Sequence, residues 1–239
     1  MKILVTGGAG YIGSHAVAEL ITQGHEVTVF DNLSTGHKEA VKCPVIVGDL
    51  LDKNILTESF SQNGFDGVIH FAGKTLPGES MKDPKKYFDN NVSGGINLLE
   101  AMKSAGVNKI VFSSSASIYG FPDKLPATEE DDKKPTSVYG ESKLMFETIL
   151  QWYDSLFGIK NVCLRYFNAC GDSMDGSIGE DHVPETHLIP SVIKAALGYT
   201  EKFVLNGSDY KTKDGTCVRD YLHVVDLAEI HIKSLDYLA

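Results

Sequence analysis

The first thirty-one residues constrain the fold more than any other stretch of the chain. An apolar run at residues 3–5 leads into the glycine-rich segment Gly7–Gly13, and a second apolar run, residues 27–30, ends at Asp31. Such runs are typical of strands buried on both faces of a parallel sheet, and residues 11–23 carry apolar side chains at helical spacing. The order strand, glycine-rich turn, helix, strand and acid predicts a dinucleotide-binding unit.

Three glycines of the turn have separate predicted roles. Gly7 permits the tight turn, Gly10 lets a pyrophosphate approach the backbone, and Gly13 lets the helix pack closely on the strand. Free N–H groups and the positive end of the helix dipole would then bind the phosphates. Asp31 lies where its carboxylate can accept hydrogen bonds from an adenosine ribose and would repel a 2′-phosphate, so NAD is favoured over NADP. The alternative is an ordinary turn between a strand and a helix.

Composition limits the classes of protein that this chain can belong to. Its 239 residues can bury a substantial core, and 42% hydrophobic with 23% charged residues is typical of a soluble globular protein. The net charge of −10 argues against nucleic acid or an anionic membrane as a partner. Because no apolar run could cross a bilayer and no signal peptide precedes the first strand, we expect a cytoplasmic protein. The four cysteines form no CxxC pair and the histidines no HExxH, so we expect reduced thiols and no metal.

Short apolar strands alternate with helical segments along the following residues. The alternation predicts an α/β fold, a Rossmann-type doubly wound parallel sheet with right-handed crossovers. Further strands are expected at residues 44–48, 67–71, 109–113 and 161–167, and helices near residues 52–62, 84–105 and 139–157. Ligands bind outside the carboxyl ends of such strands. One rim of the sheet should therefore hold Gly7, Asp31, Asp49, Phe71 and Ser113–Ser115.

A polar segment at residues 171–185, without apolar periodicity, predicts a domain boundary. We expect an NAD-binding domain at residues 1–170 and a small, incomplete C-terminal substrate lobe at residues 171–239, with residues 216–239 either in that lobe or returned to the main domain. The lobe should contain a helix at 188–197, strands at 203–205 and 218–222, and a last helix from Val225. Residues 116–138 should form a surface loop.

A tyrosine and a lysine form the candidate catalytic pair. Tyr139 and Lys143 are four residues apart on a predicted helix, so their side chains share one face. A lysine and a nicotinamide cation would both favour the phenolate of Tyr139, which could then take a proton from an alcohol while hydride leaves its carbon. Ser113–Ser115, at the tip of the fifth strand, supply hydroxyls for the same substrate oxygen. The alternative is that both side chains lie on an ordinary helix surface.

These residues resemble the extended short-chain dehydrogenase/reductases, and within them the enzymes that epimerise nucleotide sugars at C4. The similarity runs from Met1 to the last helix. Its most specific motifs are Val5–His15, Asp31–Leu33, His70–Gly73, Asp89–Val92, Phe112–Ala116, Tyr139–Lys143, Leu164–Asn168 and Val218–His223.

The resemblance implies a tightly held NAD and a set of residues around it. In addition to the three glycines and Asp31, the cofactor would contact Tyr11, Ile12, Asn32, Leu33, Ser34, Thr35, Gly36, Asp49, Leu50, Phe71, Ala72, Gly73, Asn90, Ser115, Tyr139, Lys143 and Phe167. Tyr139 would be the base and Lys143 its electrostatic partner and ribose anchor.

The resemblance also implies the substrate and the reaction. UDP-galactose and UDP-glucose would interconvert by oxidation at C4 to a 4-keto sugar and re-reduction on the opposite face. Ser115 would order the sugar 4-OH, and the UDP-sugar side would include Ser115, Tyr139, Asn168, His187, Leu188, Leu205, Asn206 and Arg219. Arg219 is the candidate diphosphate clamp; alternatively it forms a structural salt bridge with Asp220 or Asp226.

Two departures from the family pattern leave alternatives open. Similar proteins have a lysine near the NAD phosphates two positions after the residue that matches Gly73. In this chain that position is Thr75, and the lysine, Lys74, is one position earlier. Relatives also continue past Ala239, which suggests a truncated chain whose sugar-nucleotide site is open on one side. A dehydratase is disfavoured because Ser115–Ile118 contains no acid, and a non-catalytic NAD-binding fragment is the remaining alternative.

Two helices predict the oligomeric state. The helices near residues 84–105 and 139–157 bear apolar residues beyond one stripe, including Trp152 and Leu156. Helices of this kind pair across a dimer axis in the similar family, so we expect a homodimer. The alternative is that they pack only on the sheet.

Overall fold

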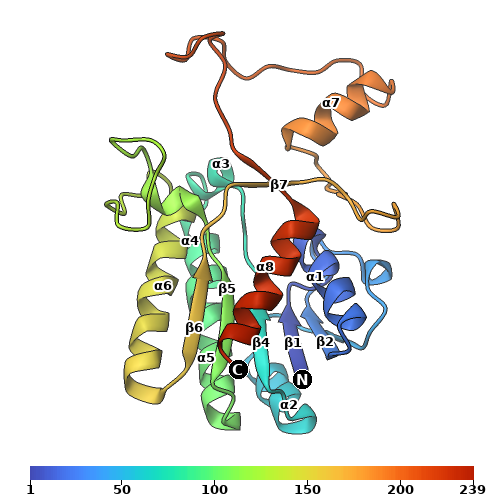
Figure 1. Cartoon of the computed structure of the whole chain (residues 1–239), viewed down its shortest axis with the longest axis vertical. Helices are drawn as coiled ribbons and strands as arrows, with labels where there is room; N and C mark the ends of the chain where they lie inside the picture. The colour runs from blue at the N-terminus through green and yellow to red at the C-terminus, as the bar shows by residue number, and fades with distance from the viewer.

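Six parallel strands form the central sheet, in the order β3-β2-β1-β4-β5-β6 (Figure 1). The computed structural model describes residues 1–239. The strands are β1 (Lys2–Thr6), β2 (Glu26–Asp31), β3 (Val45–Val47), β4 (Gly67–His70), β5 (Lys109–Ser113) and β6 (Lys160–Leu164). The strand order reverses between β1 and β4, which is where a doubly wound sheet binds its ligand. The predicted Rossmann-type sheet is confirmed.

Helices cover both faces of this sheet. In chain order the helices are α1 (Tyr11–Thr22), α2 (Lys53–Asn63), α3 (Pro77–Ser80), α4 (Pro84–Tyr87), α5 (Gly94–Ala105), α6 (Val138–Phe157), α7 (Leu188–Ala196) and α8 (Val224–Tyr237), of which α7 does not pack on the sheet. None of them is both long and apolar enough to traverse a bilayer.

Alternate residues of each strand feed two separate cores. On one face Leu4 of β1 belongs to a cluster with Leu98 of α5 and Phe146 of α6. On the other face Ile3 of β1 belongs to a cluster with residues of α1 and α8, including Ile232. Because successive side chains of a strand point to opposite faces, an unbroken apolar strand supplies both cores.

Local signals start and end the helices. The Asp52 carboxylate caps α2 by accepting from the N–H groups of Asn54 and Ile55. The Ser137 hydroxyl caps α6 by accepting from Gly140 N at 3.1 Å. After α6, Gly158 adopts the left-handed conformation, φ +70°, that stops a helix.

The predicted helix at residues 84–105 is continuous but not regular. A turn of π-helix, Phe88–Ser93, joins α4 to α5. Such turns occur often at functional sites because they rotate side chains out of the helical register. Here the turn carries Asn90 and Asn91.

The segment after β6 departs most from the sequence-based expectation. A short strand, β7 (Asn168–Cys170), was not predicted; it pairs in parallel with β8 (Tyr221–His223). The strand predicted at residues 203–205 is wrong: this stretch is coil, and Leu205 is 55% exposed. No strand lies beside it to accept its hydrogen bonds. The strand predicted at 218–222 is shifted to Tyr221–His223, because only these residues face β7.

Helix α8 packs against α1 and the sheet (Figure 1). Residues 224–237 thus lie in the main body, whereas α7 and the long coil after it project from it. The boundary at residue 170 stays a prediction.

Candidate active site

The glycine-rich turn between β1 and α1 leaves no room for side chains. Gly7 has φ +69°, and a Cβ there would lie 2.5 Å from the backbone nitrogen of Ala72. A Cβ on Gly13 would lie 2.2 Å from the carbonyl oxygen of Gly7. The helix can therefore lie this close to the turn only because residue 13 is a glycine. The turn therefore presents bare backbone at the carboxyl end of β1.

The first turn of α1 is free to bind an anion. Gly10 is its N-cap and supplies no side-chain hydrogen bond. The unpaired N–H groups of such a turn and the helix dipole together favour a phosphate. The backbone cradle thus fits the pyrophosphate of a dinucleotide.

Asp31 connects the end of β2 to this turn. Its Oδ2 accepts a hydrogen bond from Ala9 N at 3.0 Å, and its Oδ1 accepts one from Leu33 N at 2.8 Å. Each carboxylate oxygen keeps a further lone pair that can accept from a ribose hydroxyl. Asp31 is 91% buried, so its negative charge acts at close range.

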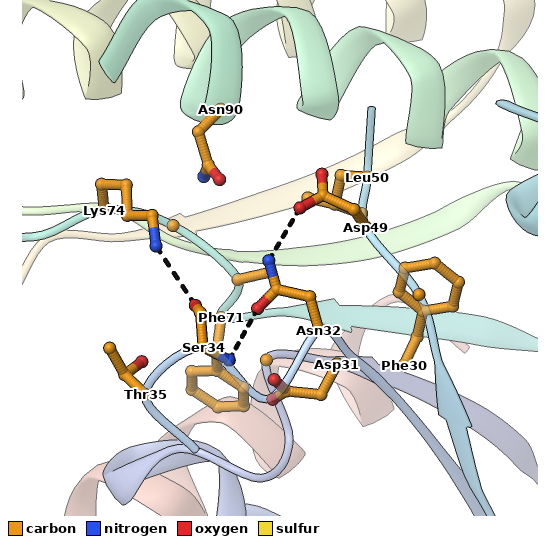
Figure 2. A pocket seen from close by; sticks show the side chains of 14 residues that line it. Phe30, Asp31, Asn32, Ser34, Thr35, Asp49, Leu50, Phe71, Lys74 and Asn90 are labelled. Atoms are coloured by element: carbon orange, nitrogen blue, oxygen red, sulfur yellow. Dashed lines mark hydrogen bonds between the residues drawn. The ribbon is translucent and has the colours of Figure 1, made fainter. Parts of the chain in front are cut away.

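A polar pocket lies next to Asp31 (Figure 2). Asn32 donates to Asp49 at 2.8 Å, and Lys74 Nζ donates to Ser34 Oγ at 3.2 Å across the pocket. Lys74 thus reaches the pocket by itself, without a lysine at position 75. The walls comprise Gly7, Phe30, Asp31, Asn32, Ser34, Thr35, Gly48, Asp49, Leu50, Phe71, Ala72, Gly73, Lys74 and Asn90.

The π-helical turn supports the same pocket. Figure 2 shows Asn90 projecting into it from its helix. The next residue, Asn91, is buried: its Oδ1 accepts from Lys74 N at 2.8 Å, and its Nδ2 donates to Lys74 O and to Ser142 Oγ. Asn91 holds the backbone after β4 against α6. The sequence motif contains it, but sequence reasoning assigned it no role.

Tyr139 and Lys143 lie on one face of α6 beside the tip of β5. Lys143 Nζ donates to the carbonyl oxygen of Ser113 at 2.8 Å and lies 5.9 Å from the centre of the Tyr139 ring. Ser115 is 91% buried and accepts hydrogen bonds from Ser117. The structure brings Tyr139, Lys143 and Ser115 together where the sequence predicts them.

Burial shifts the pKa of both titratable groups. Burial raises the pKa of the Tyr139 phenol, and hydrogen bonding with Ser115 opposes that rise. Burial lowers the pKa of Lys143 to about 8, and Glu147 opposes that fall. In the chain alone, burial thus outweighs the phenolate-favouring effects that we expect for Tyr139.

A buried ion pair lies one turn beyond Lys143. Glu147, with a side chain 3% exposed, faces Arg165, whose Nη2 donates to Glu147 Oε2 at 2.7 Å. Ser114 also donates to Glu147, and Arg165 donates to Tyr119. Sequence reasoning missed this pair, although the signal was present: Glu147 is eight residues after Tyr139, on the same helix face.

The predicted UDP-sugar residues are not gathered into a single pocket. The Asn168 side chain donates to the carbonyl oxygen of Asp220 at 2.9 Å. This bond links β7 to the residue that directly precedes β8. Arg219 is exposed and contacts only its neighbour Val218 O, so the alternative salt bridge with Asp220 or Asp226 is absent. Four further predicted UDP-sugar residues are exposed: His187, Leu188, Leu205 and Asn206. Phe167, which was predicted to contact NAD, is exposed as well.

Comparison with known proteins identifies close relatives. Residues 3–238 match the NAD dependent epimerase/dehydratase family. The whole chain is 54% identical to a UDP-glucose 4-epimerase from Lacticaseibacillus casei, of which it spans 72%. A UDP-glucose 4-epimerase from Brucella ovis, solved in complex with NAD, superposes with TM-score 0.96 at 45% identity, over 99% of this chain and 73% of that one. The enzyme from Bifidobacterium longum, solved with NAD⁺ and UDP, gives TM-score 0.95 at 40% identity, over 100% of this chain and 75% of that one.

Proposed function

The chain belongs to the NAD dependent epimerase/dehydratase family, and we propose that it interconverts UDP-galactose and UDP-glucose through a 4-keto sugar. The observation that carries the proposal is the position of Tyr139, Lys143 and Ser115. They meet at the tip of β5, next to a glycine-rich cradle that fits a dinucleotide, in a chain 54% identical to a UDP-glucose 4-epimerase.

NAD supplies the hydride acceptor and donor in this reaction. The residues that would hold it are those of the cradle and the adjoining pocket. Gly7, Gly10 and Gly13 leave the backbone of the turn open for the pyrophosphate, Asp31 accepts from the adenosine ribose, and Lys74 adds a positive charge.

Tyr139 moves the proton. Its phenolate oxygen takes the proton from the sugar 4-OH as the C4 hydride leaves, which generates the 4-keto sugar. After the sugar turns over in the site, the Tyr139 hydroxyl returns the proton to the 4-oxygen while hydride returns to the opposite face. Ser115 holds the 4-oxygen near Tyr139, and the Lys143 ammonium stabilises the phenolate electrostatically. No net oxidation occurs.

The alternative reactions lack support at the same place. A nucleotide-sugar dehydratase needs an acid directly after the fifth strand, but the short helix there, Ala116–Tyr119, has none. The nearest buried carboxylate, Glu147, is held by Arg165. A non-catalytic NAD-binding module would have no need of Tyr139, Lys143 and Ser115 in this arrangement.

The test is conversion of UDP-galactose to UDP-glucose by the purified chain without added NAD, beside Tyr139→Phe. We expect turnover by the wild type, its loss in the variant, and release of NAD from both proteins on denaturation. Wild-type protein that releases NAD but turns over no substrate would contradict the proposal.

We further propose a homodimer in which α5 and α6 pair with the same helices of a second copy. Trp152, Leu156 and Phe157 leave apolar surface on α6, with Trp152 62% exposed. Analytical ultracentrifugation should give a dimer for the wild type and a monomer for Trp152→Glu.

We also propose a cytoplasmic location. The four free cysteines support it, because thiols stay reduced in the cytoplasm.

A further inference from the structure

Four side chains of the kinds that bind transition metals meet in the segment between β7 and α7. They are Glu180, His182, Glu185 and His187, and one ligand atom from each lies within 4.8 Å of the others. Their spacing, E-x-H-x-x-E-x-H, matches neither CxxC nor HExxH. We propose that these four residues bind one Zn²⁺ ion.

The distances between the donor atoms suit a tetrahedral ion. A zinc ion with bonds of about 2.0–2.1 Å keeps its donors about 3.3 Å apart. His182 Nδ1 lies 3.3 Å from Glu180 Oε1 and 3.9 Å from Glu185 Oε2. His187 Nδ1 hydrogen-bonds to Glu180 Oε1 and lies 3.9 Å from Glu185 Oε1. The donor atoms, which lie within 4.8 Å of one another, would have to move closer together to bind one ion.

The two carboxylates of the cluster are shielded from water, and two of its ligand atoms, Glu185 Oε2 and His182 Nδ1, have no hydrogen-bond partner. The side chains of Glu180 and Glu185 are only 9% and 8% exposed, although the segment lies on the surface. Glu185 Oε2 and His182 Nδ1 are both buried and make no hydrogen bond. Because a buried polar atom without a partner costs free energy, this pair of open positions points to a ligand between them.

The mixture of donors selects the class of ion. Two imidazole nitrogens and two carboxylate oxygens suit zinc, whereas magnesium and calcium prefer sites made of oxygen alone. The competing cation is Lys194 of α7, whose Nζ lies 3.8 Å from Glu185 Oε2 and whose side chain is 32% exposed. A bound ion would displace this ammonium toward solvent and replace the hydrogen bond between His187 and Glu180, because both ligand atoms must be deprotonated to bind a metal.

The ion would fix a surface segment against the dinucleotide turn. The ring of His182 meets the ring of Tyr11, the first residue of α1, edge to face at 6.2 Å. On the outer side of the segment Asp181 pairs with His37 at 3.5 Å. Bound zinc would therefore set the start of α7 relative to the glycine-rich turn. This role is structural, and it assigns His187 to the metal instead of to the UDP-sugar side where the resemblance places it.

The test uses the full chain without an affinity tag, stripped of metal by a chelator. Zn²⁺ affinity is measured by competition with a chromophoric chelator, and the absorption spectrum of bound Co²⁺ reports the coordination geometry. The variants are His182→Ala and Glu185→Gln. Asp181→Asn is the matched control, because its side chain lies in the same segment but outside the four ligands.

We expect the wild type and Asp181→Asn to bind one Zn²⁺ with submicromolar Kd and to give a tetrahedral Co²⁺ spectrum without sulfur ligation. His182→Ala and Glu185→Gln should weaken binding at least tenfold. Zinc should raise the Tm of the wild type and of Asp181→Asn, and it should leave the Tm of His182→Ala and Glu185→Gln unchanged. This comparison distinguishes a variant that has lost the metal site from one that has lost its fold. Absence of saturable 1:1 binding, equal affinity in all four proteins, or cobalt bound to cysteine would overturn the proposal and leave a cluster of histidine–glutamate ion pairs.

Discussion

The sheet body, residues 1–170 together with α8, and the segment at residues 171–220 both contain apolar side chains but use them differently. In the body, unbroken strands and helices bury Leu4, Leu98 and Phe146 completely. In the segment not one residue is buried: Ile193 of α7 is 51% exposed, and Leu197, directly after α7, is 62% exposed. An apolar pattern becomes a core only where a second apolar surface lies opposite.

The difference also separates the chemistry from substrate contact. Tyr139, Lys143 and Ser115 rest on β5 and α6 within the body, whereas most of the predicted UDP-sugar residues lie in or next to the exposed segment. A rigid support keeps reacting groups in register, and exposed elements can be ordered by the ligand that they bind. Four predictions test the contrast.

The largest effect should come from Tyr139→Phe in the body. Removing the group that moves the proton should lower kcat about 10²–10⁴-fold, because general acid–base catalysis contributes by that order. NAD content, measured after denaturation, should not change. Arg219→Ala, within the segment, should instead raise KM for the UDP-sugar with a smaller change in kcat. A fall in kcat of the same size in both variants would contradict the proposed separation between proton transfer by the body and substrate binding by the segment.

Glu147→Ala should destabilise the body by about 3–5 kcal/mol, because it leaves Arg165 as an uncompensated, largely buried charge. Denaturant unfolding measures this loss. The control is Glu229→Ala, which removes an exposed pair with Lys233 and should cost at most about 1 kcal/mol. Equal losses would show that Arg165 finds solvent or another partner.

A matched pair of leucines tests the packing contrast directly. Leu99→Ala should cost about 2–5 kcal/mol, since its side chain is fully buried between α5 and the sheet. Leu197→Ala, at the end of α7, should change the free energy of unfolding by less than about 0.5 kcal/mol. A large loss at Leu197 would mean that α7 is covered in solution.

The smallest of the four effects is a pH dependence. Burial lowers the pKa of His231 in the folded chain to about 4. As the pH falls below 6.5, the unfolded chain binds this proton before the folded chain does, so stability is lost. The contribution of His231 to the loss between pH 7 and pH 5 should be about 2 kcal/mol, and buried His70, whose pKa is lowered to about 3, adds a loss of its own. Unfolding curves at the two pH values should differ less in His231→Phe, and an unchanged pH dependence would contradict the assignment to His231.

Much of the sheet and of the catalytic group could be predicted from the sequence because the signals are local. The strand, glycine turn and acid occupy one continuous stretch, and Tyr139 and Lys143 are separated by a single helical turn. The pairing of β7 with β8 could not be predicted, because it joins residues about fifty positions apart in the chain and each strand has only three residues. The strand expected at residues 203–205 is absent because no other strand lies beside these residues, and an apolar pattern alone does not show whether a pairing strand exists.

The sequence by itself determined the six strands, the glycine turn at Gly7–Gly13, and the pair Tyr139 and Lys143, because each depends on neighbouring residues and on the periods of helices and strands. Only the tertiary structure decided that Lys74 reaches Ser34, that Glu147 pairs with Arg165, and that Glu180, His182, Glu185 and His187 converge. These contacts depend on the paths of loops and on which side chains meet in space, and periodicity contains no record of either.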